Sequence, residues 1–385
     1  MDKNTLNGLL LMFLVFALFM WLTPKEQPAD NAPDPDTAVQ TPVATSVDSL
    51  TSAEREWLVK NISDNGHVRI LADSSRVYTL NQDGMNLSLR GDSVYGTVTV
   101  NGRDLDWAAV AAGDITRMSV SEQRKAIEAV RMASVNLGRY GKFARFLAGT
   151  PQTVRLENDV LDLQLNSLSG SITRAQLKKY DTEYSADETK KVKNPVVLFE
   201  GDKNTFNFQI PLPSPVETSQ LYFTPRQLND STVLMALDVA PDAFWGIEYT
   251  LPKGESYVVR VRVVQKNMAP VVQSNNRNLG FTWQQDLHRQ EQGRMFEERN
   301  SALYYKYAGG SVENLSESGN DTEERKAKIK WIGFKNQFFS SVVIADRPFN
   351  TADFHSTTLQ GTDYLKNMQA QAVVNDYDWT SENPA

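Results

Sequence analysis

Val160-Leu-Asp-Leu-Gln-Leu165 alternates apolar and polar side chains, and this pattern decides the fold of most of the chain. A period of two is typical of a β-strand with one face in a core and the other in water. The pattern returns in many later stretches, among them Phe206-Asn-Phe-Gln-Ile210 and Tyr257-Val-Val-Arg-Val-Arg-Val-Val264. It predicts a mainly β fold, a large antiparallel β-super-sandwich, over residues 151–350.

Three segments near or within this sandwich do not alternate. Residues 285–300 are the one helical candidate inside it, and residues 316–324 are polar and predict a loop. Residues 351–385 are expected to form a C-terminal extension, whose secondary structure the pattern leaves open.

Residues 9–22 form one unbroken apolar run near the N-terminus, behind a short polar head. A helix from Leu6 to Leu22 would rise about 26 Å, a little less than the thickness of the hydrocarbon core of a bilayer. No small-x-small cleavage site follows, because Thr23-Pro24-Lys25 comes next. We therefore favour an uncleaved transmembrane signal-anchor over residues 1–24 rather than a cleaved signal peptide. Its membrane-embedded side chains would be Leu9, Leu10, Leu11, Phe13, Leu14, Phe16, Leu18, Phe19, Trp21 and Leu22.

The short head predicts a cytoplasmic N-terminus, with the bulk of the chain on the other side of the membrane. The chain contains no cysteine, which excludes a lipoprotein anchor and suits a cell-envelope compartment. Residues 25–50 are rich in Pro and Asp and poor in large apolar residues, which predicts a flexible linker. The net charge of −7 is well mixed, and no basic block suggests a nucleic-acid partner.

Residues 51–150 predict a small α+β accessory region. Thr51 and Glu54 have the spacing of a capping box, which starts a short helix. Asn101-Gly102 lies between apolar stretches and is a strong two-residue hairpin signal.

A second capping box, Ser119 and Glu122, starts a long amphipathic helix that we expect to end only at Gly149 and Pro151. Its polar face either attracts anionic lipid or an acidic partner, or is simply solvated. The cations on this face are Arg124, Lys125, Arg131, Arg139, Lys142 and Arg145.

Motifs for phosphate binding, zinc proteolysis and serine hydrolysis are missing from the sequence. Ser63-Asp64-Asn65 matches one penicillin-binding element without its partner motifs. The histidines His67, His288 and His355 are far apart in the sequence. His288 lies near Glu291 and could join a site with it, but a surface histidine is the commoner explanation. We therefore expect no catalytic residue, cofactor or metal, and no enzymatic activity.

Aromatic residues in the second half of the chain could line a sugar or peptide groove, or fill the gap between two sheets. They are Trp283, Tyr304, Tyr305, Tyr307, Trp331, Phe334, Phe338 and Phe339. Packing between sheets is the commoner explanation, and it predicts that Trp331, Phe334 and Phe338 are largely buried. The alternation in residues 303–307 leaves one or two side chains facing outward, so a groove stays open as an alternative.

Lys330-Trp-Ile-Gly-Phe-Lys-Asn-Gln-Phe-Phe-Ser-Ser-Val-Val-Ile-Ala-Asp346 resembles a hallmark of YidC-type membrane protein insertases of Gram-negative bacteria, late in their periplasmic domain. By this resemblance its signature residues, with a structural or partner-contact role, are Trp331, Phe334, Phe338, Phe339, Ser340 and Ser341. Other stretches agree in order with the family's first transmembrane helix and with earlier parts of that domain. They are Met1-Asp-Lys-Asn-Thr5 with residues 9–22, Leu156-Glu-Asn-Asp-Val-Leu161, Gly170-Ser-Ile-Thr-Arg-Ala-Gln-Leu-Lys-Lys-Tyr180, Val196-Val-Leu-Phe199 and Leu221-Tyr-Phe-Thr-Pro225.

The resemblance implies a β-super-sandwich after the first helix, in the form with an added region that looks like the Bacteroidetes branch. It also implies a component of membrane protein insertion in the bacterial inner membrane. Its partners would be nascent membrane proteins, the Sec translocon and the lipid bilayer. In this family the insertase activity lies in a later five-helix membrane core. The sequence contains no second apolar run long enough for a membrane-spanning helix, so this core is missing from it. We therefore expect a fragment of an insertase or a free-standing periplasmic module.

One alternative stays open because architecture does not fix function. Large super-sandwiches also occur in mutarotases and polysaccharide lyases, so the chain could be a membrane-tethered carbohydrate-binding or carbohydrate-active β-sandwich. Such a function needs a concave face with a histidine or a carboxylate pair that a sugar can reach.

Overall fold

The computed structural model describes residues 49–385 apart from 83, 187–192, 273–276, 362 and 383–385. The expected signal-anchor at residues 1–24 and nearly all of the expected linker lie outside the described residues. In the described ranges, no helix combines the length and the apolar character needed to cross a membrane.

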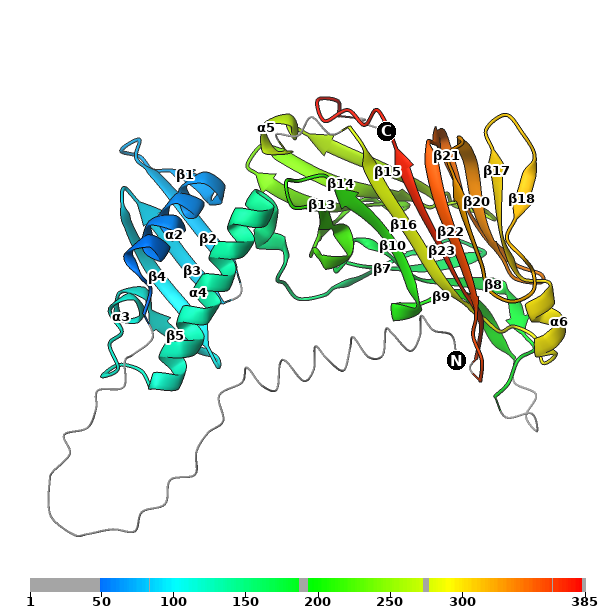
Figure 1. Cartoon of the computed structure of the whole chain (residues 1–385), viewed down its shortest axis with the longest axis horizontal. Helices are drawn as coiled ribbons and strands as arrows, with labels where there is room; N and C mark the ends of the chain where they lie inside the picture. The colour runs from blue at the N-terminus through cyan, green and yellow to red at the C-terminus, as the bar shows by residue number, and fades with distance from the viewer. Residues whose placement is uncertain (1–48, 83, 187–192, 273–276, 362, 383–385) are drawn as a thin grey trace, which may run out of the picture. The chain divides into compact units, whose positions relative to one another are not determined.

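The N-terminal part of the described chain is a five-stranded antiparallel sheet with helices on one face (Figure 1). The strands, in sheet order, are β1 (His67–Ile70), β2 (Arg76–Gln82), β3 (Met85–Arg90), β4 (Ser93–Val100) and β5 (Arg103–Asp106). The helices are α2 (Ser52–Asn65), α3 (Trp107–Ala112) and α4 (Val120–Tyr140). Strand β3 shows the two faces, since Met85, Leu87 and Leu89 are buried in the core under the helices whereas Asn86 and Arg90 are exposed.

The local signals of this region are confirmed. Thr51 and Ser119 each cap a helix, and in both capping boxes the glutamate three residues later bonds back to the cap. Asn101 and Gly102 both have positive φ, 53° and 78°, and they join β4 to β5 as the hairpin signal predicts.

The long helix ends earlier than the sequence predicts. α4 stops at Tyr140 because Gly141 adopts a φ of 54°, which takes the backbone out of the α region. The chain continues as a 3₁₀ helix, η1 (Gly141–Phe146). This change of direction places Phe143 in the large core of the following region and Ala144 in the small core of the preceding one.

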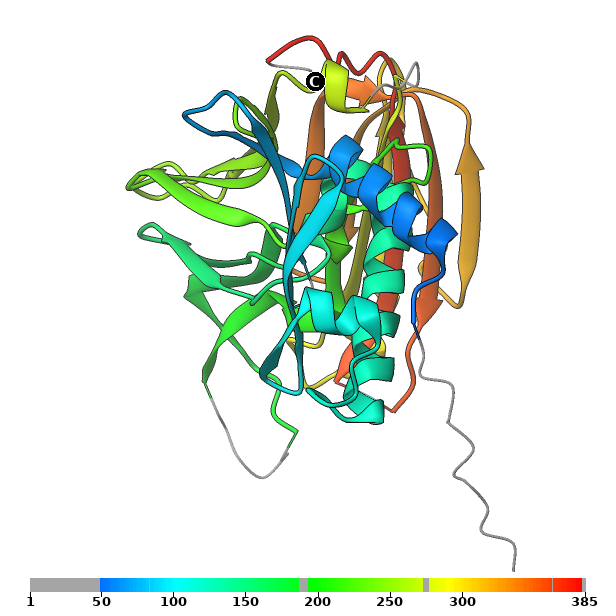
Figure 2. The same ribbon diagram turned by 90° about the vertical axis from the view of Figure 1, so that its left-hand side faces the viewer.

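The rest of the chain is mainly β, as predicted, and its strands form four antiparallel sheets around one continuous core. The largest sheet has the order β11 (Val216–Glu217), β10 (Asn204–Ile210), β16 (Leu279–His288), β23 (Tyr364–Val374), β22 (Thr351–Thr358), β19 (Asp321–Arg325). Figures 1 and 2 show β16, β23 and β22 side by side in it.

Three four-stranded sheets complete this region. The first is β6 (Thr153–Glu157), β7 (Leu161–Asn166), β8 (Ser171–Thr182) and β9 (Asn194–Glu200). The second is β12 (Thr224–Asn229), β13 (Thr232–Ala240), β14 (Ala243–Thr250) and β15 (Arg260–Lys266). The third has the order β18 (Val312–Asn314), β17 (Ala302–Tyr307), β20 (Ile329–Lys335), β21 (Ser340–Phe349).

Short helical segments connect some of these strands. They are η2 (Gly201–Lys203), η3 (Thr218–Gln220), α5 (Ala269–Val272) and α6 (Arg294–Arg299). The helical candidate at residues 285–300 was therefore mostly wrong, because β16 runs to His288 with regular alternate burial and only α6 is helical.

Two further expectations need correction. β22 and β23 belong to the largest sheet, so this sheet continues past residue 350, the end that the sequence predicts for the sandwich. The polar segment 316–324 contains most of β19, which pairs with β22 along the edge of that sheet. β19 contains no apolar residue, so its pairing with β22 rather than local hydrophobicity fixes it as a strand.

Candidate functional site

The stretch 330–346 folds into a hairpin of β20 and β21, which we call the signature hairpin. Its register pairs Phe334 with Ser341, Ile332 with Val343, and Trp331 with Ile344. Because side chains alternate across a strand, Phe334 and Ile332 point into the core, whereas Trp331, Val342 and Ile344 share the outer face.

The inner face of the hairpin is core, as the sequence predicts for Phe334. The Phe334 side chain is fully buried and stacks on Trp283 of β16, with ring centroids 3.8 Å apart and planes 16° from parallel. Tyr305 of the neighbouring strand β17 is also fully buried and stacks on Phe354 of β22. These ring pairs join the third four-stranded sheet to the largest sheet.

The outer face of the hairpin is apolar and exposed. Trp331 is half-buried, and its ring lies 3.5 Å from the position that a side-chain carbon on Gly333 would occupy. Val342 is 48% exposed and Ile344 is 65% exposed. Phe338, which we expected to be buried, is 66% exposed, because it lies in the turn that the Asn336 N–H closes on the Phe339 carbonyl.

Phe339 belongs to a second aromatic group at the start of β21. Its ring meets Tyr180 of β8 edge-to-face at 5.6 Å, and Tyr180 lies 6.5 Å from Tyr257. Both tyrosines are nearly half exposed. One or two side chains of residues 303–307 are expected to face outward. Tyr304 is half-buried and donates to Glu317, whereas Tyr305 is in the core.

Four signature residues, Phe334, Phe339, Ser340 and Ser341, line a small hollow together with residues of β9 and β16. Its volume is about 10 Å³, which is room for about one water molecule. Gln285 and Gln290 lie in the hollow and donate to the carbonyls of Leu198 and Val197 on β9. A sugar ring does not fit such a space.

His288 also borders the hollow, but its carboxylate neighbour is not Glu291. Its Nε2 lies 3.9 Å from Glu200, and its Nδ1 lies 2.7 Å from the Arg289 carbonyl. Tyr364 packs edge-on against His288, and burial together with the Glu200 charge raises the pKa of Tyr364 to about 12. The described residues include no group of three or more acidic or histidine side chains placed to hold a metal ion.

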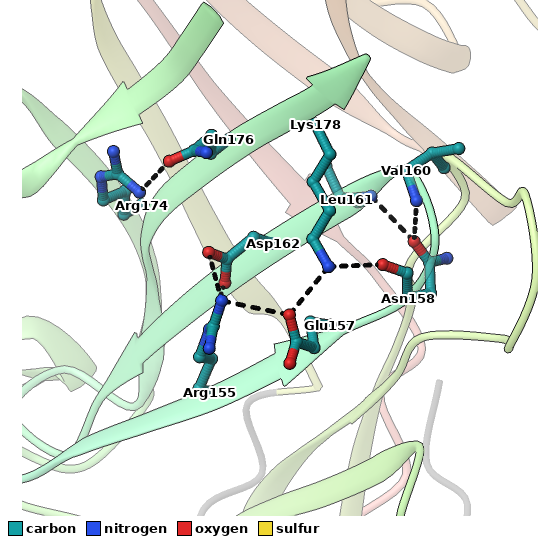
Figure 3. A network of polar contacts seen from close by, with 9 residues as sticks. All are labelled: Arg155, Glu157, Asn158, Val160, Leu161, Asp162, Arg174, Gln176 and Lys178. Carbon is teal, nitrogen blue, oxygen red and sulfur yellow. Dashed lines mark hydrogen bonds and ion pairs between the residues drawn. The ribbon is translucent and has the colours of Figure 1, made fainter. Parts of the chain in front are cut away.

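A polar network on the outer side of β6, β7 and β8 holds a turn rather than a ligand (Figure 3). Arg155 makes two hydrogen bonds to Asp162, which lower the pKa of that carboxyl. Lys178 donates to Glu157 and to the Asn158 carbonyl. Arg155, Glu157, Asp162 and Lys178 are thus paired with one another, so this network has a structural role.

Asn158 extends this network to a distant loop. Its side-chain oxygen accepts from the N–H groups of Val160 and Leu161, and its NH₂ group donates to the carbonyls of Pro252 and Ser256. Asn158 therefore ties the β6–β7 turn to the loop that carries Tyr257.

The cations expected on the polar face of the long helix lie on α4 and η1, and some of them have partners within the structure. Arg131 pairs with Glu54 of α2 at 2.8 Å, and Lys125 donates to Asn101 at 3.2 Å. Arg145 lies over the Phe146 ring, and burial lowers its pKa. Arg124 and Arg139 are exposed, so both the lipid-facing and the solvated interpretations stay predictions.

A family model described as the YidC periplasmic domain matches residues 153–376, from the first strand of the β6–β9 sheet to just beyond β23. The chain belongs to this family. The match includes β22 and β23, which agrees with their place in the largest sheet.

Curated relatives carry the name membrane protein insertase YidC. The relative from Parabacteroides distasonis is 36% identical over 238 residues, which are 61% of this chain and 36% of that protein. The relative from Porphyromonas gingivalis is 29% identical and matches 69% of this chain, and the one from Bacteroides fragilis is 30% identical and matches 60%. The chain covers only 36 to 41% of the length of these relatives.

Among solved structures, a galactose mutarotase-like protein from Lactobacillus casei is similar over 58% of this chain and 87% of its own, with a TM-score of 0.31 and 9% identity. A mutarotase-related enzyme from Lactobacillus acidophilus gives a TM-score of 0.32 at 10% identity. Likenesses this weak carry no argument about function.

Proposed function

We propose that this chain is the anchor and periplasmic domain of a YidC-type insertase, and that it takes part in the insertion and folding of integral membrane proteins. The observation that carries the proposal is the family match over residues 153–376, together with curated relatives that are named membrane protein insertases. The antiparallel sheets around one core suit the β-super-sandwich that the family resemblance implies.

In this proposal residues 1–24 hold the chain in the bacterial inner membrane with the N-terminus in the cytoplasm. Residues 25–50 are a flexible linker, and residues 51–150 are an accessory region before the super-sandwich. The apolar run at residues 9–22 and the Pro- and Asp-rich stretch after it support this arrangement. The partners would be nascent membrane proteins, the lipid bilayer and the Sec translocon.

The proposed mechanism is binding. An extended apolar surface is unusual on a soluble domain and often marks an interaction site. The signature hairpin exposes Val342 and Ile344 on its outer face and Phe338 in its turn, and we place the contact there. The carbohydrate alternative is weaker, because the hollow beside His288 has room for about one water molecule.

The test is insertion of a reporter membrane protein in cells depleted of their own insertase. Three strains carry the complete native reading frame, the 385-residue chain alone, or the complete frame without residues 153–376. The proposal predicts that the complete frame restores protease-protected insertion and that the 385-residue chain alone does not. Full insertion by a frame without residues 153–376, for every reporter tried, would contradict a role for this domain.

A further inference from the structure

β21 is an edge strand whose outer edge is open. It pairs with β20 through Ser340–Ile344, and no strand of the described chain pairs with its other side. After Ile344 the register shifts, since the next pair is Ile329 with Phe349. Asp346, Arg347 and Pro348 lie in that irregularity. The regular part of this unpaired edge is therefore about five residues, or roughly 17 Å, long, and its first two residues, Ser340 and Ser341, border the hollow beside β9.

This edge lacks the usual protection. Proteins commonly guard an edge strand with lysine, proline, a bulge or a covering side chain, because unpaired backbone groups recruit other strands. The segment Ser340-Ser-Val-Val-Ile-Ala345 holds no charge and no proline. By contrast, the edge strand β9 at the same hollow is covered by Gln285 and Gln290, which donate to its carbonyls. The protection begins only at Asp346.

The end of the open edge is basic. Lys330 reaches across from β20 and donates to the carbonyls of Ala345 and Asp346. A lysine ammonium has three donors, so one is left over. Arg347 is exposed beside it and makes no ion pair with the described residues. These two cations outnumber the single carboxylate of Asp346, which favours an acidic group at this end of an occupant.

We propose that β21 binds an extended, apolar segment of another polypeptide as an added β-strand, with an acidic residue of that segment near Lys330 and Arg347. Backbone hydrogen bonds to Ser340–Ile344 would supply the pairing, and the exposed Val342 and Ile344 would contact alternate side chains of the segment. The inference rests on the proposed function, because it names an unfolded stretch of a client protein as the partner.

The probe is a synthetic peptide of about seven residues, with alternating valine and threonine between two aspartates, and the protein is the full chain in nanodiscs. Binding is measured by fluorescence anisotropy. Two further peptides carry N-methyl groups on the odd or on the even residues. Only one of these sets faces β21, so we expect one methylated peptide to lose binding and the other to keep it. A peptide with lysines in place of the aspartates should bind more weakly.

The protein variants are V342K with I344K on β21, and V312K as the matched control. Val312 and Val342 are both 48% exposed and lie on the two opposite edge strands of one sheet. We expect the β21 variant to weaken peptide binding about tenfold or more and the control to leave it unchanged. Unchanged urea midpoints would show that both variants fold.

Several results would overturn the proposal. They are no binding of the unmethylated peptide, equal binding of both methylated peptides, or equal binding by the β21 variant and the control. Dimerisation of the free chain that the β21 variant abolishes, without any peptide binding, would make the edge a self-interface instead. Binding to phosphatidylglycerol vesicles that the variant abolishes, again without peptide binding, would make it a lipid surface. None of these outcomes depends on the insertion assay, so the two proposals can fail separately.

Discussion

Trp283 and Phe334 stack face to face in the middle of the large core, with their ring centroids 3.8 Å apart. Trp283 comes from the largest sheet and Phe334 from the signature hairpin, so this pair fixes one sheet against the other. The indole N–H of Trp283 is buried and has no hydrogen-bond partner among the described residues. The close packing of these two rings therefore leaves one buried polar group without a hydrogen bond among the described residues.

The stack predicts a large stability difference between two phenylalanines of the same hairpin. Phe334→Ala should lower the free energy of unfolding by about 3–5 kcal/mol, because it empties a fully buried site. Phe338→Ala should change it by less than about 0.5 kcal/mol, because that ring is mostly in solvent. Urea denaturation followed by tryptophan fluorescence measures both. Equal losses would mean that the inner and outer faces are assigned wrongly.

Asn158 should couple the β6–β7 turn to the loop at residues 252–259. Asn158→Ala removes four hydrogen bonds and leaves buried backbone groups without partners, so we expect a loss of about 1–3 kcal/mol. Amide hydrogen exchange should rise both in the turn and in the distant loop. Faster exchange in the turn alone would show that the loop is held by other contacts. Arg155→Ala, which removes an exposed partner of Asp162, is the matched control.

Replacement by alanine should be tolerated at Gly333 and should destabilise the fold at Gly96. A side-chain carbon on Gly333 would lie 3.4 Å or more from its neighbours, so Gly333→Ala should be nearly neutral. Gly96 has a φ of 131°, and a side-chain carbon there would lie 1.9 Å from the Asn86 carbonyl oxygen. Gly96→Ala should therefore lower the free energy of unfolding of the accessory region, residues 51–150, by about 2–4 kcal/mol. Comparable midpoints in thermal unfolding would refute this account of β3 and β4.

The capping box of α2 predicts a pH dependence. The Thr51 N–H and then Arg131 lower the pKa of Glu54 from 4.5 to about 2. A carboxyl whose pKa is lowered in the folded state stabilises the fold at any pH above its pKa in the unfolded chain. That stabilisation is lost as the pH falls from 4.5 towards 2. Glu54→Gln should thus be less stable than the original chain at pH 7, and the gap should narrow below pH 4.5. A gap independent of pH in urea titrations would exclude this role for the charge.

Local signals in the sequence were sufficient for much of the fold. The capping boxes at Thr51 and Ser119 and the Asn101-Gly102 hairpin each depend on neighbouring residues only, and the structure confirms all three. The helix end at Gly141 was missed because the apolar spacing continues past it, whereas the conformation of that glycine is what ends the helix.

Features that depend on distant partners were out of reach. The exposure of Phe338 follows from a tight turn between β20 and β21, and an apolar pattern alone cannot distinguish that turn from the strand. The strand β19 is polar and is specified by its pairing with β22. The stacking of Trp283 on Phe334 and the glutamines that cover β9 join residues about 50 or more positions apart, without a local signal.

The most direct test of the central claim is the side of the membrane on which residues 49–385 lie. The chain has no cysteine, so single cysteines at the exposed Asp92 or at Thr5 can be labelled selectively. With the outer membrane permeabilised and the inner membrane intact, a membrane-impermeant maleimide should label D92C in the membrane fraction and should leave T5C unlabelled until the inner membrane is broken. Labelling of T5C but not D92C in intact cells, or recovery of D92C as a soluble product lacking residues 1–24, would contradict an anchored periplasmic domain.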